Sequence, residues 1–502
     1  MDTLSLLMSG MQTALTYQNI LAAIAGAFLG LMVGAMPGIG SLAGVALLLP
    51  ITFQFEPVTG IIMLSAVYYS NMYGGSYSAI LLNIPGDSPA VMTALDGNKM
   101  AKNGKAGKAL FTANISSFIG GTVGIIFLTL LGPAMARFGL KFGPVEMAAL
   151  LMVAMTSLSW LMGDSPTKGV ITTLLGILIA TIGFDIIVGT PRYHFDSLYL
   201  LGGVPFIPLV IGMFGFSQVM DMMEIRKNKH HIETKLSIKD SLLTMKEIKR
   251  IIPVSIRSSL LGTSVGVLPG AGATTGSFLG YMIEKKVGKN SEQMGEGAME
   301  GVSAAEAANN SAAASAFAPL LSLGIPGSGT GAVLLGGLLM YGLNPGPLLF
   351  TNEPDFTWGV IASLYLANII TLLVALSIIP FLVKILKVPV EIMIPIITVI
   401  CIVGAYCSSN SYFGIIVMLV SGVIGFFLKK NDYPIAPLLL AFVLAPTLEV
   451  NIRRALLISE GDPLIFFQKP ISLVLMTFLF LIILYPIIKK LFFNNHQKQQ
   501  VL

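Results

Sequence analysis

The sequence predicts an all-α polytopic membrane protein with about 11 crossings and two re-entrant hairpins broken by glycine and proline, arranged as an inverted internal repeat. The first observation is composition: of 502 residues, 54% are hydrophobic and 11% are charged, and the mean hydropathy is +0.82. These values exclude a soluble globular domain. The second observation is a series of apolar stretches of about 17 to 25 residues, the length that one helix needs to cross a bilayer. The third is a motif that occurs twice.

This motif is rich in glycine and proline and occurs at residues 34–44 and 266–276. An Ile-Pro-Gly turn follows each copy, at 84–86 and 325–327. Gly/Pro interruptions at matching points of two apolar halves indicate a transporter's binding site. The motif residues singled out are Gly34, Pro37, Gly38, Gly40 and Ser41 in the first copy and Gly266, Pro269, Gly270, Gly272 and Thr274 in the second. The turn residues are Asn83, Pro85, Gly86, Pro326 and Gly327.

The apolar segments match in number between two halves. In the first half we expect crossings near 61–82, 110–131, 145–162, 170–188 and 200–220. In the second half we expect them near 303–325, 358–379, 391–407, 412–428 and 433–448, with one further crossing near 471–488. The predicted division is a first transmembrane repeat at 1–220, a basic cytoplasmic loop at 221–250, a second repeat at 251–448, and a C-terminal loop, extra helix and basic tail at 449–502.

Lysine and arginine placement orients these segments, because loops rich in these residues stay in the cytoplasm. The basic clusters lie at 99–108, 221–257, 384–387, 429–430 and 489–490. With these clusters inside, the hairpin at 20–53 enters from outside and the hairpin at 251–283 enters from inside, which makes the repeat inverted. Two full crossings in place of each hairpin are the alternative. The scheme leaves on the outside Arg137, Lys141, Arg192, Arg453 and Arg454.

The broken helices are suited to bind an anion. Proline removes a backbone donor, and glycine lets a ligand approach the main chain closely. Backbone N–H groups freed in an apolar medium need partners, and a carboxylate at the positive end of a half-helix supplies them. Freed carbonyl groups could hold Na⁺. The alternative for each motif is a helix kink or a small-residue packing face.

A polar patch lies between the two glycine-rich points of each half. Its residues are Ser70, Asn71, Tyr73, Gly74, Gly75 and Ser76 in the first half and Glu306, Asn309, Asn310 and Ser311 in the second. When Pro85 is set against Pro326, Ser70 falls opposite Ser311. Neutral hydroxyls and amides can orient an anion without a buried charge, and Glu306 is expected to carry a coupling proton or to contact Na⁺. Hydrogen bonding between helices is the alternative role for the serines.

Several classes of function find no support in the sequence. The net charge of +5 follows from the positive-inside rule, so no nucleic-acid partner is expected. Two cysteines and four scattered histidines show no metal-ligand spacing. The chain has no Gly-x-x-x-x-Gly-Lys-Ser/Thr loop for ATP and no His-Glu-x-x-His zinc motif. Asp87 is expected either in the site or in a solvated turn, while Asp185 is expected to be structural.

These residues resemble those of the large membrane subunit of the bacterial tripartite tricarboxylate transporters, over nearly the whole chain. The segments that carry the resemblance are 34–44, 73–86, 96–104, 189–195, 266–276, 300–310, 324–327 and 449–456. One departure between the two halves is Gly324, where the first half has Asn83, so a contact from that amide would occur in one half only.

The resemblance implies a secondary transporter of the bacterial inner membrane that imports carboxylates such as citrate. It implies an ion gradient, of Na⁺ or H⁺, and no cofactor. It also implies two protein partners, a small membrane subunit and an extracytoplasmic solute-binding protein. The alternatives are an anion channel and a carboxylate transporter that needs no binding protein, and both use the same backbone dipoles. An intramembrane hydrolase is the enzyme alternative, and its catalytic context is missing.

Overall fold

The structure, a computed structural model, describes residues 3–36, 39–161, 165–225, 242–268, 270, 272–385 and 390–498. These residues are mostly helical, and the sheet among them is an antiparallel hairpin of β1 (Gly183–Phe184) and β2 (Pro191–Arg192). Seven helices in this part of the chain are long and apolar enough to cross a membrane. The all-α polytopic membrane fold is therefore confirmed, while the count of about 11 crossings and the inversion of the repeat stay predictions.

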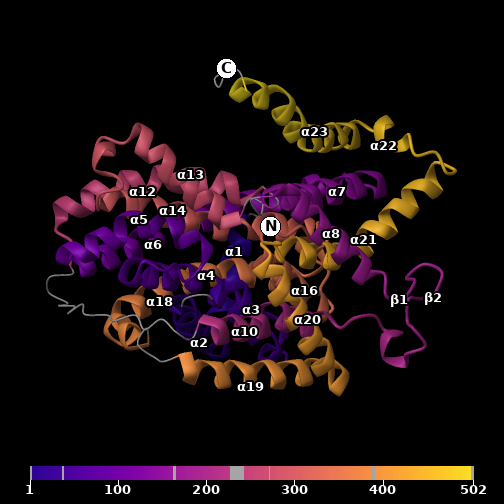
Figure 1. Cartoon of the computed structure of the whole chain (residues 1–502), viewed down its shortest axis with the longest axis horizontal. Helices are drawn as coiled ribbons and strands as arrows, with labels where there is room; N and C mark the ends of the chain where they lie inside the picture. Colours follow the sequence, from indigo (N-terminus) through magenta and orange to yellow (C-terminus); the bar gives the residue numbers. More distant parts are fainter. Residues whose placement is uncertain are drawn as a thin grey trace. The chain divides into compact units, whose positions relative to one another are not determined.

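The chain forms two compact units, and Figure 1 labels their helices. Unit 1 combines Met1–Gly139 with Pro205–Phe427, and unit 2 combines Leu140–Val204 with Leu428–Leu502. Each unit takes chain from both predicted repeats. The predicted division into repeats therefore describes the order along the sequence and not the compact units, and it stays a prediction.

Unit 1 contains most of the helices, in two series along the chain. The first series is α1 (Thr3–Ala14), α2 (Tyr17–Ala35), α3 (Gly40–Thr52), α4 (Pro57–Leu82), η1 (Ser88–Ala90), α5 (Val91–Met100), η2 (Ala101–Lys105), α6 (Ala106–Gly139), α9 (Phe206–Val210), η4 (Ile211–Phe216) and α10 (Ser217–Ile225). The second series is α12 (Met245–Gly266), α13 (Gly272–Val287), η5 (Ser291–Gln293), α14 (Met299–Ser315), α15 (Phe317–Leu323), α16 (Gly329–Met340), α17 (Leu349–Asn352), α18 (Pro354–Ile385), α19 (Val390–Ser409) and α20 (Tyr412–Lys430).

Unit 2 contains α7 (Pro144–Leu161), α8 (Pro166–Ala180), η3 (Leu198–Leu200), α21 (Ala436–Ile458), α22 (Ile465–Gln468) and α23 (Pro470–Lys498), together with the β-hairpin. Helix α21 packs against α7 and α8, and α23 packs against α7. The predicted crossing at 170–188 is wrong beyond Ala180, where α8 ends. The chain turns there because Gly183 has φ +115° and because the Asp185 carboxylate accepts the N–H groups of Ile187 and Val188, at 2.8 and 2.9 Å.

Helices α4 and α14 form the centre of unit 1. Every residue of α4 from Thr59 to Ile80 is buried, and so is every residue of α14 from Glu300 to Ser315. Helix α4 packs against α2, α3, α6 and α18, while α14 packs against α5, α6, α12 and α13. A helix that is buried on all sides must satisfy its polar side chains inside the protein. The polar patches predicted from the sequence are therefore interior features.

The helix breaks fall in the two glycine motifs. In the first motif α2 ends at Ala35, and α3 begins at Gly40, which has φ +66°. In the second motif α12 ends at Gly266, and α13 begins at Gly272, which has φ +61°. Glycine is required at both starts because a positive φ is strained for other residues. Pro37, Gly38 and Pro269 lie outside the described residues.

The two motifs also pack in the same way. Gly34 backs onto the backbone of Asn71, and Gly266 backs onto the backbone of Ala312, its equivalent when Pro85 is set against Pro326. One turn earlier, Gly30 faces Ser70, and Gly262 faces Ser311, the pair that the same alignment matches. The described structure thus has matching glycine contacts at matching positions of the two halves.

Asn83 in the first turn and Gly324 in the second have the same backbone conformation, although the residue types differ. Asn83 ends α4 with φ 59°, and Gly324 ends α15 with φ 69°, so both are left-handed helix caps. Asparagine and glycine are the residues that favour this conformation. The second turn has glycine because a Cβ at Gly324 would lie 2.6 Å from the Pro345 carbonyl oxygen.

We therefore expect Asn83→Gly to leave the stability of the protein nearly unchanged and Gly324→Asn to lower it by about 1–3 kcal/mol, because the added side chain overpacks against backbone. Thermal unfolding of the purified variants in detergent measures the difference. Equal losses in the two variants would contradict the steric explanation.

Candidate substrate and ion site

An internal carboxylate occupies the first glycine motif. The backbone N–H of Ser41, at the start of α3, donates to Asp87 Oδ2 at 2.8 Å, and the N–H of Ser88 donates to Asp87 Oδ1 at 2.8 Å. The Ser41 hydroxyl lies 3.0 Å from the hydroxyl of Thr330 on α16. A carboxylate at a helix N-terminus meets both the free N–H groups and the positive end of the dipole. Asp87 is therefore bonded to the motif from a partly exposed turn, and its role in a binding site stays a prediction.

The second motif also begins its helix at a glycine of positive φ, Gly272, but no carboxylate bonds this start among the described residues. Ser328 stands where the first repeat has Asp87, and its hydroxyl accepts the N–H of Gly331 at 3.1 Å, which caps α16. A Cβ at Gly272 would lie 3.7 Å from the Gly327 carbonyl oxygen and 3.8 Å from Ser328 Cβ. The turn after α15 thus faces the start of α13, as the turn after α4 faces the start of α3. Thr274 is exposed on α13.

The glycines of the first half allow close backbone packing. Gly74 lies against the backbone of α2, and Gly86, which follows Pro85, lies against the carbonyl oxygen of Gly34. The Gly86 N–H donates to the Gly75 carbonyl oxygen at 3.3 Å. In the second half, Gly327, which follows Pro326, would place a Cβ 3.2 Å from the Gly266 carbonyl oxygen. The described structure explains these glycines by packing, and their contact with a ligand stays a prediction.

The hydroxyls of the first polar patch bond within unit 1. Ser70 donates to the Ala66 carbonyl oxygen at 2.7 Å, and Ser76 donates to that of Tyr73 at 2.7 Å. Tyr73 donates its hydroxyl to Asn368 Oδ1 on α18 at 2.8 Å, as does Tyr69 at 2.7 Å. Asn368 was not predicted from the sequence. An amide inside the apolar stretch 358–379 is the signal that could have found it, because polar groups in crossings are expensive unless they are bonded.

Three buried amides have polar atoms with no hydrogen-bond partner in the described structure. Both side-chain polar atoms of Asn71 and of Asn309 lack one, and so does Oδ1 of Asn310. All three residues have 0% exposure. Native proteins satisfy most buried polar groups, and an exception calls for a ligand or a water molecule. Ser311, in contrast, donates to the Ala308 carbonyl oxygen at 3.1 Å.

Glu306 places a carboxylate beside these amides. It lies on α14 with 0% exposure, and it accepts hydrogen bonds from Thr93 on α5 at 2.5 Å and from Ser117 on α6 at 3.1 Å. The amide Nδ2 of Asn310 donates to the Glu306 backbone carbonyl oxygen at 3.0 Å. The structure thus gathers Glu306, Asn309 and Asn310 on one buried helix, as the sequence predicted, and adds Thr93 and Ser117.

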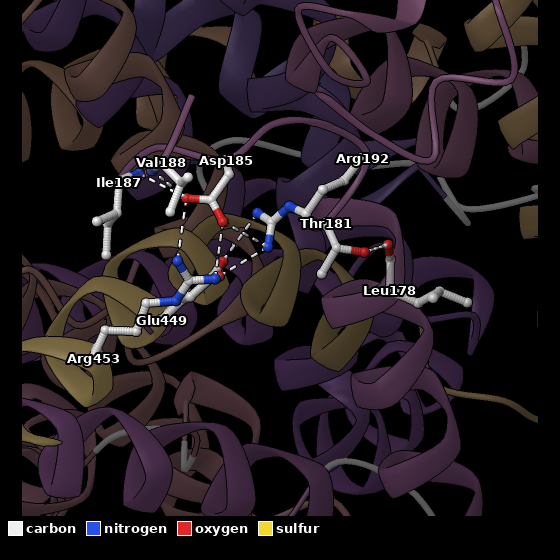
Figure 2. Close-up of polar contacts among 8 residues, drawn as sticks. All are labelled: Leu178, Thr181, Asp185, Ile187, Val188, Arg192, Glu449 and Arg453. Carbon is white, nitrogen blue, oxygen red and sulfur yellow. Dashed lines mark hydrogen bonds and ion pairs between the residues drawn. The ribbon is translucent and has the colours of Figure 1, made fainter. Parts of the chain in front are cut away.

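Unit 2 contains a separate ion-pair network, shown in Figure 2. Arg453 of α21 donates to Asp185 Oδ2 at 2.9 Å and lies 2.6 Å from Glu449 Oε1. Arg192 of β2 forms two hydrogen bonds with Glu449, at 2.8 and 3.2 Å. The network joins the segments 189–195 and 449–456 and fastens the β-hairpin to α21. Asp185 therefore has the structural role that the sequence predicted, and its partners Arg192, Glu449 and Arg453 were not predicted.

The pKa of Asp185 is lowered to about 2, first by the N–H groups of Val188 and Ile187 and then by Arg453. Because the folded pKa lies below the ordinary value of about 3.9, this carboxylate stabilises the fold above that value, and the stabilisation is lost as the pH falls toward 2. We expect Asp185→Asn to lower the unfolding temperature at neutral pH and to flatten its fall between pH about 4 and about 2.

The matched control is Asp196→Asn, which removes an exposed carboxylate from the same loop. Thermal unfolding in detergent, measured across this pH range, compares the two variants. The same pH dependence in both variants would contradict a special role for Asp185.

Comparisons with known proteins place this sequence in a family. The family model described as "Tripartite tricarboxylate transporter TctA family" matches residues 20–440. An uncharacterized 52.8 kDa protein of Agrobacterium vitis, named for the TAR-I ttuC' 3' region, is 39% identical over 94% of this chain and 94% of its own length. An uncharacterized protein of the same organism, named for the TAR-II ttuC' 3' region, is 41% identical over 42% of this chain and 87% of its own length. No solved structure matches the chain. The chain belongs to the TctA family of tripartite tricarboxylate transporters.

Proposed function

We propose that this chain imports tricarboxylates or related carboxylates across the bacterial inner membrane, driven by a gradient of Na⁺ or H⁺. It works with an extracytoplasmic solute-binding protein and a small membrane subunit. Membership of the TctA family, the apolar helices and the repeated broken-helix motif support the proposal. The chain has no proposed catalytic role.

The observation that carries the proposal is the Asp87 carboxylate on the first motif. The N–H of Ser41 at a broken-helix start binds this carboxylate inside unit 1. The second motif has the same kind of start, with Gly272 at positive φ, and its facing turn provides Ser328 in place of an acid. The substrate carboxylate then takes at α13 the position that Asp87 takes at α3. Recognition by backbone N–H groups suits several carboxylates, because it reads the shared carboxylate group.

Movement of the bound carboxylate follows from the inverted repeat. Two half-helix starts that enter from opposite faces bring their positive ends toward the midplane, where a site can open to either side in turn. The substrate reaches this site from the solute-binding protein.

Uptake of labelled citrate and of a panel of dicarboxylates tests the proposal, in cells that express the chain with both partner proteins, with and without a Na⁺ gradient. Uptake that needs the binding protein and a gradient supports it. Flux through this chain alone that is independent of any gradient would replace the proposal with an anion channel. Uptake that needs a gradient but no binding protein would replace it with a two-component or single-component carboxylate transporter.

The difference between Asp87 in the first turn and Ser328 in the second suggests a variant that tests the substrate position directly. Ser328→Asp introduces into the second turn the acid that the first turn has, and aspartate caps a helix as well as serine does, so α16 should still form. We expect this variant to reach the membrane at normal levels and to lose uptake, because its own carboxylate takes the substrate's place. The control is Ser328→Asn, which caps the helix without a charge and should retain most of the uptake. Equal uptake in the two variants would reject the substrate position at α13.

A further inference from the structure

We propose that Glu306 is the centre of a binding site for one Na⁺ ion per chain. The proposal rests on the proposed function, for which it names the coupling ion and its position. Three helices of unit 1 build the site: α14 contributes Glu306 and Asn309, α5 contributes Thr93, and α6 contributes Ser117. Figure 1 shows α5, α6 and α14 in one group of helices, and α14 packs against both of the others.

The atoms around the Glu306 carboxylate are those that a hard cation prefers. Thr93 Oγ1 lies 2.5 Å and Ser117 Oγ lies 3.1 Å from the two carboxylate oxygens. Asn309 lies three residues further on, on the same face of α14. Its Oδ1 and Nδ2 are buried and have no hydrogen-bond partner in the described structure. A carboxylate, two hydroxyls and an amide oxygen form an oxygen ligand set for a hard ion.

The buried charge of Glu306 also indicates a cation site. No ion pair to Glu306 occurs among the described residues, and its exposure is 0%. An isolated carboxylate in an apolar interior is strongly disfavoured unless a cation or a proton neutralises it. Other buried carboxylates of the described chain have a cation or backbone N–H groups: Glu284 bonds Arg257, Glu300 contacts Arg250, Asp96 accepts three N–H groups, and Glu146 accepts the Gly143 N–H.

The internal repeat limits the site to one per chain. When Pro85 is set against Pro326, the position equivalent to Glu306 is Ser65, and Ser65 Oγ has no partner in the described structure. The positions equivalent to Thr93 and Ser117 are Leu334 and Trp358, which offer no oxygen ligand. The set related by the repeat, Ser65 with Leu334 and Trp358, therefore has neither the charge of Glu306 nor the hydroxyls of Thr93 and Ser117.

The site is also joined to the substrate motif. Thr93 lies on α5, in the segment that begins at the Ile-Pro-Gly turn, and Asp87 of this turn caps α3. A cation bound to Glu306, with the Thr93 hydroxyl turned from the carboxylate toward the ion, replaces the hydrogen bond between Thr93 and Glu306 by a shared ligand between the segment and α14. Without the cation, Thr93 and Ser117 donate to the Glu306 carboxylate, so the hydrogen bond from Thr93 joins the segment to α14 instead.

Cation binding to the purified chain, in detergent and without any carboxylate substrate, tests the site. Thermal unfolding is followed while Na⁺ replaces choline at constant ionic strength, since a ligand that binds the folded state raises the unfolding temperature. We expect the unchanged chain to be stabilised by Na⁺ and Glu306→Gln to show no response. The matched control is Ser65→Ala at the equivalent position, which should respond like the unchanged chain.

A second variant covers the case in which Glu306→Gln does not fold. Thr93→Val keeps the shape and removes one ligand, and it should shift the Na⁺ midpoint upward by about tenfold. The proposal is overturned if the unchanged chain ignores Na⁺, if stability follows pH alone, or if Glu306→Gln or Thr93→Val responds like the unchanged chain. Na⁺ binding at Glu306 without uptake of any carboxylate would support the site and reject the proposed function. Carboxylate uptake by the unchanged chain, together with a normal Na⁺ response in Glu306→Gln, would support the proposed function and reject the site.

Discussion

Freed backbone N–H groups at a broken helix need an anionic or polar partner when water is absent, and this constraint explains most of unit 1. The start of α3 finds its partner in Asp87, which lies 46 residues further along the chain. That bond fixes the turn after α4 against the start of α3. The glycines then follow, because the backbones of α2, of α4 and of this turn approach too closely for a Cβ at Gly34, Gly74 or Gly86.

Duplication repeats the same constraint in the second half, where we propose that a ligand meets it. Both halves have a broken helix, a positive-φ glycine at the second helix start and a facing Ile-Pro-Gly turn. The first half satisfies its helix start internally with Asp87, while the second half has Ser328, which serves the cap of α16. The two copies of the motif thus differ in charge at this position, with Asp87 in the first half and Ser328 in the second. A transporter that closed both starts with its own acids would leave no such place for a substrate carboxylate.

The sequence was sufficient where the chemistry is local. Composition and apolar segment length predicted the membrane fold, and glycine with proline predicted the breaks at Ala35 and Gly266. It was insufficient where partners are distant along the chain. Asn368, which accepts from Tyr69 and Tyr73, and Thr93, which donates to Glu306, come from other helices. No spacing rule links such residues, because their meeting depends on which helices pack together.

The crossing predicted at 170–188 shows a different limit. Apolar residues continue past Ala180, so hydropathy alone extends the helix, but Gly183 and Asp185 turn the chain into a hairpin. The hairpin is stable because Asp185 finds Arg453 on α21, at a sequence separation of 268 residues. Hydropathy measures transfer from water and contains no information on such pairs.

The buried acids of unit 1 differ in which groups stabilise their negative charge. This difference distinguishes acids with a structural role from Glu306, which we propose binds an ion. Asp96 accepts hydrogen bonds from the N–H groups of Gly295, Gly297 and Ala298, each at 2.8 Å. Backbone donors are fixed in place, so they keep this carboxylate bonded in one arrangement. Glu306 is held by hydroxyls, which can either donate to it or turn their lone pairs toward a cation. A site that must load and release an ion needs partners of this second kind. Glu306 lies on α14, which packs against α5, the helix that follows the first Ile-Pro-Gly turn, and against α12 and α13, which flank the second break.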